Sequence, residues 1–559
     1  MNYGVMLNAY PDSIGETLRD AVDFLKRPEI QGAFTSCYFL PTLFHTDIDH
    51  GFSVISYDLN ELTATEEDLK ELQAMGMDLK MDFILNHLSA LSPQYQDVVR
   101  RGEESPYKDF FINWNTFWKD HGTMTEAGFI QPDPDVLKVM PIRKEILPFM
   151  FMRYPDGKKV PYWNTFYQDI QYQHVDYYDV MQALGVQYTP AMMLSEAANA
   201  AIDAGKTPSE IDYGALNHYK AGMTDLLKAR RRCMGQMDLN IDSPLVWDFY
   251  REVLTKLKSL GATMVRLDAF TMCHKEPGRV NFMNEPETWD VMGRVRKLTE
   301  EIGLEIIAEV HVPYATGAYE KLNKNHCTAY DFFLPGMIID ALDLHDATYL
   351  RKWAQEIHGK KLDIVNMLGC HDGIPLRDIH GLLPDERITA LGDRMMGRGG
   401  LMKLLFGAQK IYYQMDVTYY SALGEDDKKM VMARALQMFM PGRPEVWYLD
   451  LFVGKNDYAN IEADPMKQNR EINRTRLSLA DVEEGLKKPV VKAQIELIRL
   501  RSGCPAFSRD AQMNFEETEN GLRITWRHAG AEAVLEADLH TYDTKVTTSG
   551  WEGAGEFRF

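Results

Sequence analysis

The stretch MVRLDAF at residues 264–270 decides the fold of this chain. Its apolar residues are typical of a buried strand, and the strand ends at a charged residue, Asp268. Because side chains alternate along a strand, Arg266 and Asp268 lie on the same face. A neighbouring cation lowers the pKa of a carboxyl group and keeps it ionised. A structural Arg–Asp pair would have the same sequence, so the interpretation needs support from other strands.

Other apolar runs end in the same way, at Asn86-His87, at Glu309 and at His371-Asp372. Helical patterns separate several of these runs, which predicts βα units and a parallel sheet. In a (β/α)8 barrel the active site is built at the carboxyl ends of the strands. We therefore expect a (β/α)8 barrel with its site at these residues. The expected strands are 4–8, 33–39, 80–86, 263–267, 305–310, 329–333 and 363–368.

Composition excludes several classes of partner. The 559 residues carry a net charge of -21, which disfavours nucleic acid and anionic membranes. No apolar stretch of 18 or more residues and no signal peptide are visible, so we expect no membrane association. The six cysteines are scattered without a zinc-like spacing, which is typical of reduced thiols in a cytoplasmic protein.

The carboxylates at the strand ends indicate glycosyl transfer. A retaining mechanism needs one carboxylate as nucleophile and a second as acid/base, about 5 Å apart. Asp268 beside Arg266 fits the first role, and Glu309 after an apolar strand fits the second. Asp372 could bind sugar hydroxyls in the transition state. Each residue alone is more simply explained as structural, but their recurrence at strand ends favours catalysis.

These motifs also carry a family resemblance. Four are MDFILNHLS (81–89), MVRLDAF (264–270), IIAEVH (306–311) and CHDGI (370–374). With DHGFSVISY (49–57), MPGRPEVWYLDLFVGKND (440–457) and REINR (470–474), the sequence resembles the α-amylase superfamily, glycoside hydrolase family 13, and within it the sucrose phosphorylase group.

The resemblance implies residue roles. Asp268 is the expected nucleophile, Glu309 the acid/base and Asp372 the transition-state stabiliser. The expected substrate-binding residues hold the glucosyl ring, close its pocket, or contact phosphate and the leaving group. They are Arg266, His87, His371 and Phe52 around the ring, Asp49 and Arg470 at its far side, and His311, Tyr413 and Gln414 toward the acceptor.

The implied function is that of a retaining α-glucosyl phosphorylase of sucrose-phosphorylase type, acting through a covalent β-glucosyl-enzyme. Sucrose or a related α-glucoside would donate glucose to phosphate, without a metal or organic cofactor. The alternatives are a glucosylglycerol-type phosphorylase and an α-glucoside hydrolase or transglucosylase. A homodimer is left open, and so is a non-catalytic binding protein, although the intact carboxylate trio argues against the latter.

Two departures from the family pattern fall at the expected anion site. Asp133 lies in a stretch that carries an arginine in the family, and Met272 occupies the place of a tyrosine. An aspartate there would repel phosphate, so either the acceptor differs or another cation compensates. The candidate cations are Arg143, Arg153, Lys275 and Arg377.

We expect the barrel to be interrupted twice and followed by a separate domain. The barrel segments are 1–86, 243–372 and 428–506, with an inserted domain at 87–242 and a second inserted region at 373–427. A helical insertion at about 167–235 is either an appendage for structure or dimerisation, or a wall of the acceptor pocket. Short strands separated by turn residues predict a small antiparallel domain at 507–559.

Overall fold

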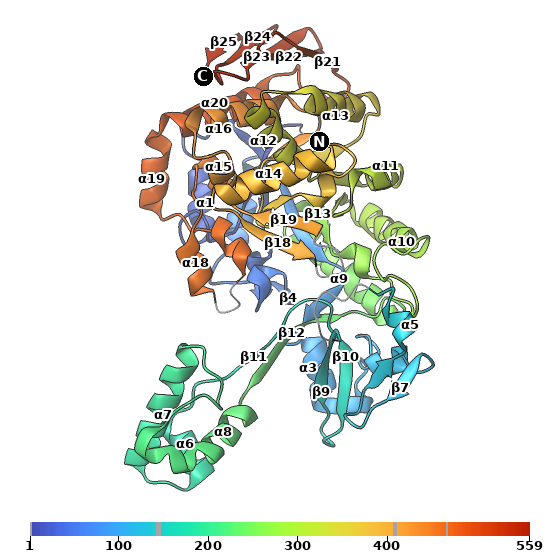
Figure 1. Cartoon of the computed structure of the whole chain (residues 1–559), viewed down its shortest axis with the longest axis vertical. Coiled ribbons are helices and arrows are strands. Elements are labelled where there is room, and N and C mark those ends of the chain that lie inside the picture. The colour runs from blue at the N-terminus through green and yellow to red at the C-terminus, as the bar shows by residue number, and fades with distance from the viewer. Residues whose placement is uncertain (1–2, 141–146, 406–410, 465–467) are drawn as a thin grey trace.

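A computed structural model describes residues 3–140, 147–405, 411–464 and 468–559. Eight parallel strands from across the chain close into a barrel surrounded by helices (Figure 1). In order around the barrel they are β1 (Val5–Ala9), β2 (Phe34–Phe39), β5 (Asp78–Ile84), β13 (Ala262–Asp268), β14 (Glu305–Ala308), β15 (Thr328–Asp331), β16 (Ile364–Met367) and β20 (Arg443–Trp447). The expected (β/α)8 fold is confirmed.

Seven of these strands coincide with the apolar runs in the sequence, and β20 does not. Its sequence, RPEVW, contains a proline, which lacks a backbone N–H and is rare inside a sheet. The strand nevertheless closes the barrel, because it pairs with β1 on one side and β16 on the other. Its Glu445 is buried against Lys80 of β5, so an ion pair inside the barrel accounts for its polar sequence.

Helices cover the outside of the barrel and follow ordinary end signals. Thr65 and Asp68 form a capping box at the start of α2 (Glu66–Ala74). Pro244 and Pro489 occupy the first turns of α9 (Pro244–Ser259) and α20 (Pro489–Gly503), where a missing N–H costs nothing. The other covering helices are α1 (Leu18–Leu25), α10 (Glu287–Ile302), α11 (Ala318–Lys324), α12 (Leu334–Leu344), α13 (Thr348–Gly359) and α16 (Asp427–Phe439).

A first long insertion follows β5 at the carboxyl end of the barrel. It begins with β6 (His87–Ser89) and continues through small sheets and short helices to β12 (Arg232–Asp238), which pairs back onto β6. Its other elements are α3 (Pro93–Arg101), α4 (Trp114–Phe117), β7 (Gly122–Met124), β8 (Ile130–Pro132), α5 (Pro134–Leu137), β9 (Phe149–Arg153), β10 (Lys159–Trp163) and β11 (Gln168–Gln171).

A helical arm, residues 172–230, projects from this insertion away from the barrel (Figure 1). Its helices are α6 (Tyr177–Leu184), α7 (Tyr188–Asp203) and α8 (Lys220–Ala229), which surround a separate apolar core. The ribbon formed by β11 and β12 carries the arm. Every apolar residue of that core belongs to the arm, so the arm packs as a unit of its own.

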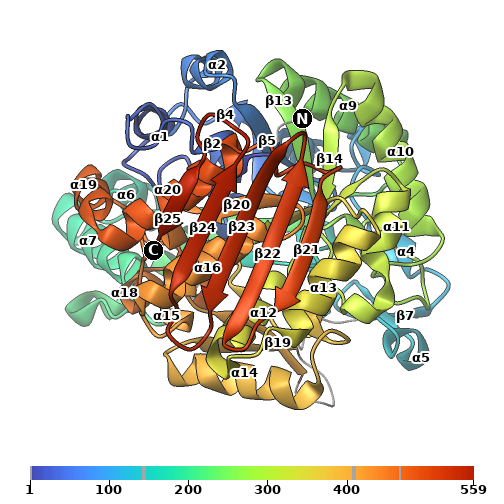
Figure 2. The same cartoon turned by 90° about the horizontal axis from the view of Figure 1, so that it is seen from above.

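A second insertion and a C-terminal sheet complete the molecule. The second insertion follows β16. Its strands β17 (Ile374–Pro375) and β18 (Leu401–Leu405) both pair with β19 (Ile411–Asp416), and α14 (Asp385–Gly397) lies between β17 and β18 in the sequence. The five-stranded antiparallel sheet crosses the far end of the barrel (Figure 2). It comprises β21 (Gln512–Glu517), β22 (Gly521–His528), β23 (Ala531–Asp538), β24 (Thr544–Ser549) and β25 (Gly555–Arg558).

The expected antiparallel C-terminal domain is therefore present. The indole of Trp526 donates to the carbonyl of Phe439, which joins the sheet to α16. Among the described residues, no helix combines the length and apolar composition that a bilayer-spanning segment needs.

Candidate active site

One guanidinium group connects the ends of three neighbouring strands. Arg266 of β13 is 3% exposed at its side chain. Its Nη1 lies 2.5 Å from Asp82 Oδ1 and 3.1 Å from Asp268 Oδ1, and its Nη2 lies 2.7 Å from Glu309 Oε1. The barrel thus brings the two expected catalytic carboxylates together, because β13 and β14 are adjacent and end at the same level.

Asp268 and Glu309 affect each other's pKa. Burial raises the pKa of Asp268 well above its usual range; Arg266 opposes this rise, and repulsion from Glu309 adds to it. Burial also opposes ionisation of Glu309, but Arg266 and His311 lower its pKa to about 2. The two groups titrate as a coupled pair whose proton lies on Asp268 in the free protein, the reverse of the ionised Asp268 and protonated Glu309 expected from the sequence.

A second set of charges closes one side of this site. Asp372, beyond the end of β16, accepts from Arg470 Nη1 at 2.8 Å, and Arg470 also pairs with Asp49. Gln236 of β12 donates to Asp49 Oδ2 at 3.0 Å. Burial opposes ionisation of Asp372, but His371 and nearby arginines hold its pKa well below the usual range. Asp372 therefore stays ionised.

The backbone around Asp49 is held in an unusual conformation. Asp49 and His50 have φ values of 60° and 48°, in the left-handed region that non-glycine residues rarely adopt. The next residue, Gly51, has φ 102°, and a Cβ there would lie 2.7 Å from the Thr42 nitrogen. Such strain persists only where surrounding contacts maintain it, as the pairing with Arg470 does here.

Aromatic rings lie between these two sets of charges. Phe52 stacks on His371 with ring centroids 4.9 Å apart and planes 16° apart. The guanidinium of Arg266 lies 5.3 Å from the Phe52 centroid. His87, at the start of β6, places Nε2 2.9 Å from the Phe52 carbonyl oxygen. All four residues expected around the glucosyl ring thus lie together next to Asp268.

His311 connects Glu309 to the second insertion. Its Nε2 lies 3.3 Å from Glu309 Oε1, and its Nδ1 lies 2.9 Å from Asp378 Oδ2. Burial opposes a charge on the imidazole, but Tyr413 and these two carboxylates outweigh it and raise the pKa of His311 well above its usual range. His311 is therefore a cation beside the acid/base candidate.

Tyr413 and Gln414 lie on β19, opposite the carboxylates. The Tyr413 ring centroid is 6.4 Å from that of His311. Gln414 is buried and donates to Asp416 Oδ1 at 2.7 Å. The structure therefore brings all twelve predicted site residues to one end of the barrel, with contributions from both insertions.

Lys275 lies where the first insertion meets the barrel. Its Nζ is 2.8 Å from Asp238 Oδ2, 2.9 Å from Asn86 Oδ1 and 2.6 Å from the Met272 carbonyl oxygen. The side chain is 3% exposed. One ammonium thus joins the loop after β13, the end of β5 and β12 of the insertion.

The cations proposed to compensate for Asp133 differ in where they lie and in whether they are already paired. Lys275 is buried and paired, and Arg143 lies outside the described residues. Arg153 is exposed at the end of β9, on the first insertion. Arg377, in the 3-10 turn Arg377–Ile379, remains beside the site because Asp378 contacts His311.

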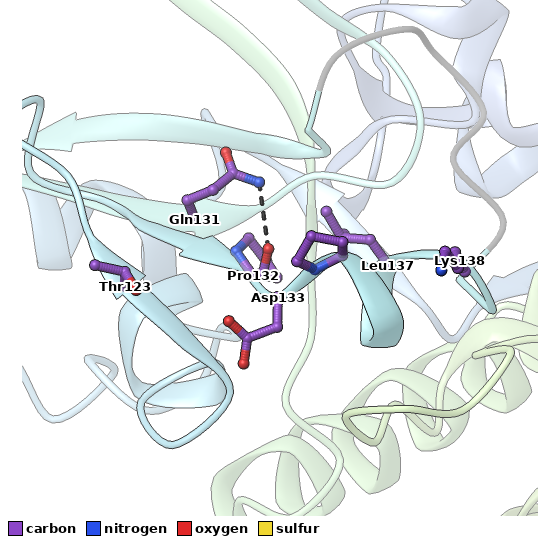
Figure 3. A pocket seen from close by; sticks show the side chains of 7 residues that line it. Thr123, Gln131, Pro132, Asp133, Leu137 and Lys138 are labelled. Carbon is purple, nitrogen blue, oxygen red and sulfur yellow. Dashed lines mark hydrogen bonds between the residues drawn. The ribbon is translucent and has the colours of Figure 1, made fainter.

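Asp133 and Met272, the two departures from the family pattern, differ in their surroundings. Asp133 lines an open hollow of about 530 Å³ together with Thr123, Gln131 and Lys138 (Figure 3). No catalytic candidate is among the residues that line it. Met272 is buried and serves the Lys275 contact through its carbonyl group.

Among the described residues, two groups of side chains have donor atoms close enough to one another for a metal ion. Glu309, His311 and Asp372 form one, and His274, Glu276 and Glu287 form the other. In the first, Arg266 and Arg470 already contact the carboxylates. In the second, Arg279 pairs with both glutamates, at 3.3 Å and 3.1 Å. Guanidinium groups thus supply the positive charge that an ion would bring.

Several residues that hold the site were not singled out from the sequence. Asp82 anchors Arg266 and accepts from the Tyr38 hydroxyl at 2.8 Å. Asp378 orients His311, and Gln236 supports Asp49. A signal for Asp82 exists, because Lys80 and Asp82 alternate along an otherwise apolar strand and must share a face. Asp378 lies in a 3-10 turn and Gln236 on β12 of the insertion, and the sequence pattern there marks neither residue.

The chain is similar to phosphorylases of α-glucosides. No family model matches it. A sucrose 6(F)-phosphate phosphorylase of Ilumatobacter coccineus is 42% identical over 553 residues, covering 97% of this chain and 95% of the relative. A glucosylglycerol phosphorylase of Marinobacter adhaerens is 29% identical, covering 99% and 98%.

Solved structures agree with the barrel. The crystal structure of a sucrose 6F-phosphate phosphorylase from Thermoanaerobacter thermosaccharolyticum has a TM-score of 0.80 at 27% identity, covering 100% of this chain and 98% of that chain. An α-amylase from H. orenii has a TM-score of 0.60 at 14% identity, covering 96% and 90%, which shows the fold. The chain belongs to the sucrose phosphorylase family of glycosyl-transferring enzymes, within glycoside hydrolase family 13.

Proposed function

We propose that this protein is a retaining α-glucosyl phosphorylase that cleaves sucrose 6F-phosphate, and sucrose less efficiently, with inorganic phosphate. The observation that carries the proposal is the bridge from Arg266 to both Asp268 and Glu309 at adjacent strand ends. Relatives named for sucrose 6(F)-phosphate, at 42% and 28% identity, support the choice of substrate.

The proposed reaction has two displacements. Asp268 Oδ attacks the anomeric carbon while Glu309 gives its proton to the departing fructosyl oxygen, so the C1–O bond breaks and a β-glucosyl ester forms. A phosphate oxygen then attacks the same carbon and the Asp268 carboxylate leaves. The product is α-glucose 1-phosphate, and Glu309 regains a proton from the phosphate.

The proton that this reaction needs is present in the pair. In the free protein the proton of the pair lies on Asp268, so it must pass to Glu309 when substrate binds. A sugar that contacts Asp268 displaces the hydrogen bond between the two carboxyl groups, which leaves the proton to Glu309. Asp372 stays ionised beside Arg470 and is placed to accept hydrogen bonds from glucosyl hydroxyl groups.

The cationic His311 suits phosphate as the second substrate. Its Nε2 lies 3.3 Å from Glu309 Oε1, the carboxylate that the proposed mechanism places beside the attacking phosphate. A charged imidazole attracts the phosphate dianion and orients it without removing a proton from it. Water has no charge and gains less from this cation, so the arrangement favours phosphorolysis over hydrolysis.

The direct test compares donors and acceptors with the purified chain. Sucrose 6F-phosphate, sucrose and glucosylglycerol are incubated with and without phosphate, and glucose 1-phosphate and free glucose are measured. We expect phosphate-dependent glucose 1-phosphate, with the highest kcat/KM for sucrose 6F-phosphate. Equal glucose release with and without phosphate would identify a hydrolase. Preference for glucosylglycerol would support the second candidate, which the Marinobacter relative suggests.

We also propose a homodimer formed through the helical arm. Tyr177, Tyr178, Tyr188 and Met193 are 45–59% exposed there, and the Tyr177 and Tyr188 rings contact each other at 5.0 Å. The arm, residues 172–230, carries seven acidic and four basic side chains, so the exposed aromatic side chains, and not a neutral charge, support the contact. Contact between arms keeps two acidic bodies apart.

Light scattering tests this association. We expect a dimer that dissociates when Tyr177 and Tyr188 are both replaced by serine, whereas the exposed residue Leu62 on the barrel tolerates serine without dissociation. A wild-type monomer at micromolar concentration would contradict the proposal. A cytoplasmic location is proposed as well, and the six unpaired cysteines support it.

A further inference from the structure

Binding a phosphorylated substrate requires a cation that is not already neutralised. A phosphate monoester carries a charge of about -1.5 to -2 at neutral pH. In the donor pocket each strong cation has carboxylate partners: Arg266 contacts three, Arg470 contacts two and Lys275 contacts Asp238. These groups hold the protein's own carboxylates and have little capacity left for another anion.

Two cations of the second insertion are different. Lys403 on β18 and Arg377 after β17 have no ion pair within 4 Å among the residues that the structure describes. Both strands pair with β19, and Pro375 and Lys403 both lie opposite Gln414. The backbone N–H of Leu376 donates to the Tyr413 carbonyl at 3.0 Å. The two cations therefore lie on either side of the acceptor residues Tyr413 and Gln414.

Lys403 is also linked to the catalytic centre by a continuous set of contacts. Its Nζ lies 5.9 Å from the Tyr413 ring centroid, which lies 6.4 Å from that of His311. His311 in turn contacts Glu309 at 3.3 Å. The charge of Lys403 also opposes the effect of burial on Asp416, whose pKa is raised to about 7. Lys403 thus acts on the interior of the site although its side chain is exposed.

Distance decides which phosphate these cations can serve. Inorganic phosphate must attack the carbon bound to Asp268, so it lies near Glu309 and His311. The phosphoryl group of a sucrose 6F-phosphate is at the outer end of the leaving fructosyl unit. Lys403 is separated from Glu309 by Tyr413 and the His311 imidazole. Arg377 precedes Asp378, which contacts the Nδ1 of His311, whereas the Nε2 of the same ring faces Glu309.

We infer that Lys403 and Arg377 form an anion subsite that binds the phosphoryl group of the leaving sugar. This inference rests on the proposed phosphorylase function and names the residues that determine its substrate preference. It also explains why Asp133 is tolerated on the first insertion. The positive charge for the sugar phosphate comes from the opposite wall, and Asp133 lines a separate hollow.

The test measures initial rates of glucose 1-phosphate formation with the full chain and its Lys403→Met and Arg377→Met variants. A hydrogen bond to a charged group is worth a factor of about ten to a hundred in affinity. We expect each variant to raise KM for sucrose 6F-phosphate about tenfold or more. KM for sucrose and for inorganic phosphate should change less than about twofold. Lys403→Arg should restore most of the preference.

The matched control is Lys138→Met, which removes a lysine from the Asp133 hollow on the other wall. It should leave every KM unchanged, and an effect confined to this variant would place the subsite there instead. Equal increases in KM for sucrose and sucrose 6F-phosphate in Lys403→Met would show that Lys403 has a structural role and does not bind the sugar phosphate. An increase in KM for inorganic phosphate alone would assign the cations to the acceptor.

A binding experiment separates this inference from the proposed function. Calorimetry with fructose 6-phosphate and with fructose measures the subsite without turnover. We expect the wild type to bind fructose 6-phosphate at least about tenfold more tightly than fructose, and Lys403→Met to lose that difference. If the wild type has the preference and the variants keep it, the subsite is wrong and the function stands. If the wild type shows no preference, both the substrate and the subsite are wrong.

Discussion

Replacing Lys275 with methionine tests how the first insertion is held on the barrel. The ammonium contacts three oxygens within 2.9 Å and is almost fully buried. Methionine preserves the length of the side chain and removes the charge. Asp238 then remains buried without its cation, held by the Thr165 backbone at 2.8 Å and by Asn86 at 2.9 Å.

The expected loss of stability follows from these contacts. Breaking a buried ion pair by removing one partner costs about 3–5 kcal/mol, and the remaining hydrogen bonds to Asp238 favour the lower end. Activity should fall as well, because Asn86 precedes His87 and β12 carries Gln236. We expect limited proteolysis of the first insertion to become faster and the first urea transition to shift to lower concentration.

A double variant separates charge from packing. Lys275→Met with Asp238→Asn leaves no uncompensated charge, so it should unfold at a higher urea concentration than Lys275→Met alone. Lys138→Met, at a lysine 74% exposed, is the control and should have no effect. If the single variant unfolds like the wild type, or if the double variant is the less stable of the two, the electrostatic explanation is refuted.

Three further predictions concern single groups. Asp268→Asn should lower kcat by about 10⁴-fold or more with an unchanged circular dichroism spectrum, and residual turnover near the wild-type rate would mean that the nucleophile is misassigned. The Asp268–Glu309 pair needs one proton for catalysis, so kcat/KM should fall as pH rises through the raised pKa of that pair. If the pH at which kcat/KM falls shifts in His311→Asn, the titrating group is His311 instead. Burial raises the pKa of Asp450 to about 7, so the folded state holds a proton that the unfolded chain loses near pH 4. The free energy of unfolding should therefore decline as pH rises from about 4 to about 7. Asp450→Asn should flatten that decline in urea titrations, and an unchanged slope would show that other groups cause it.

The barrel, and the position of the candidate catalytic residues at its strand ends, could be predicted from the sequence because each leaves a local signal. Parallel strands buried on both faces are apolar runs, and Asp268, Glu309 and Asp372 each follow such a run. β20 left no such signal, because Pro444 and the buried ion pair of Glu445 interrupt the apolar pattern. Tertiary pairing outweighed local sequence preference there.

The acceptor wall could not be read in the same way. Lys403 and Arg377 become neighbours of Tyr413 only because β17 and β18 pair with β19, and no spacing in the sequence specifies that pairing. Lys275 was a candidate for binding phosphate until its burial against Asp238 was known. The sequence does not show whether a lysine in a loop has a carboxylate partner. Anion-binding lysines therefore cannot be identified from sequence alone.

The proposed double displacement predicts the stereochemistry of the product, which gives the most direct test. The purified chain is incubated with sucrose 6F-phosphate and inorganic phosphate, and the sugar phosphate is followed from the first turnovers by phosphorus and proton magnetic resonance. Two inversions at the same carbon, with Asp268 as intermediate carrier, predict α-glucose 1-phosphate as the first product, formed only when phosphate is present. Initial formation of the β anomer, or free glucose released at the same rate without phosphate, would contradict the account.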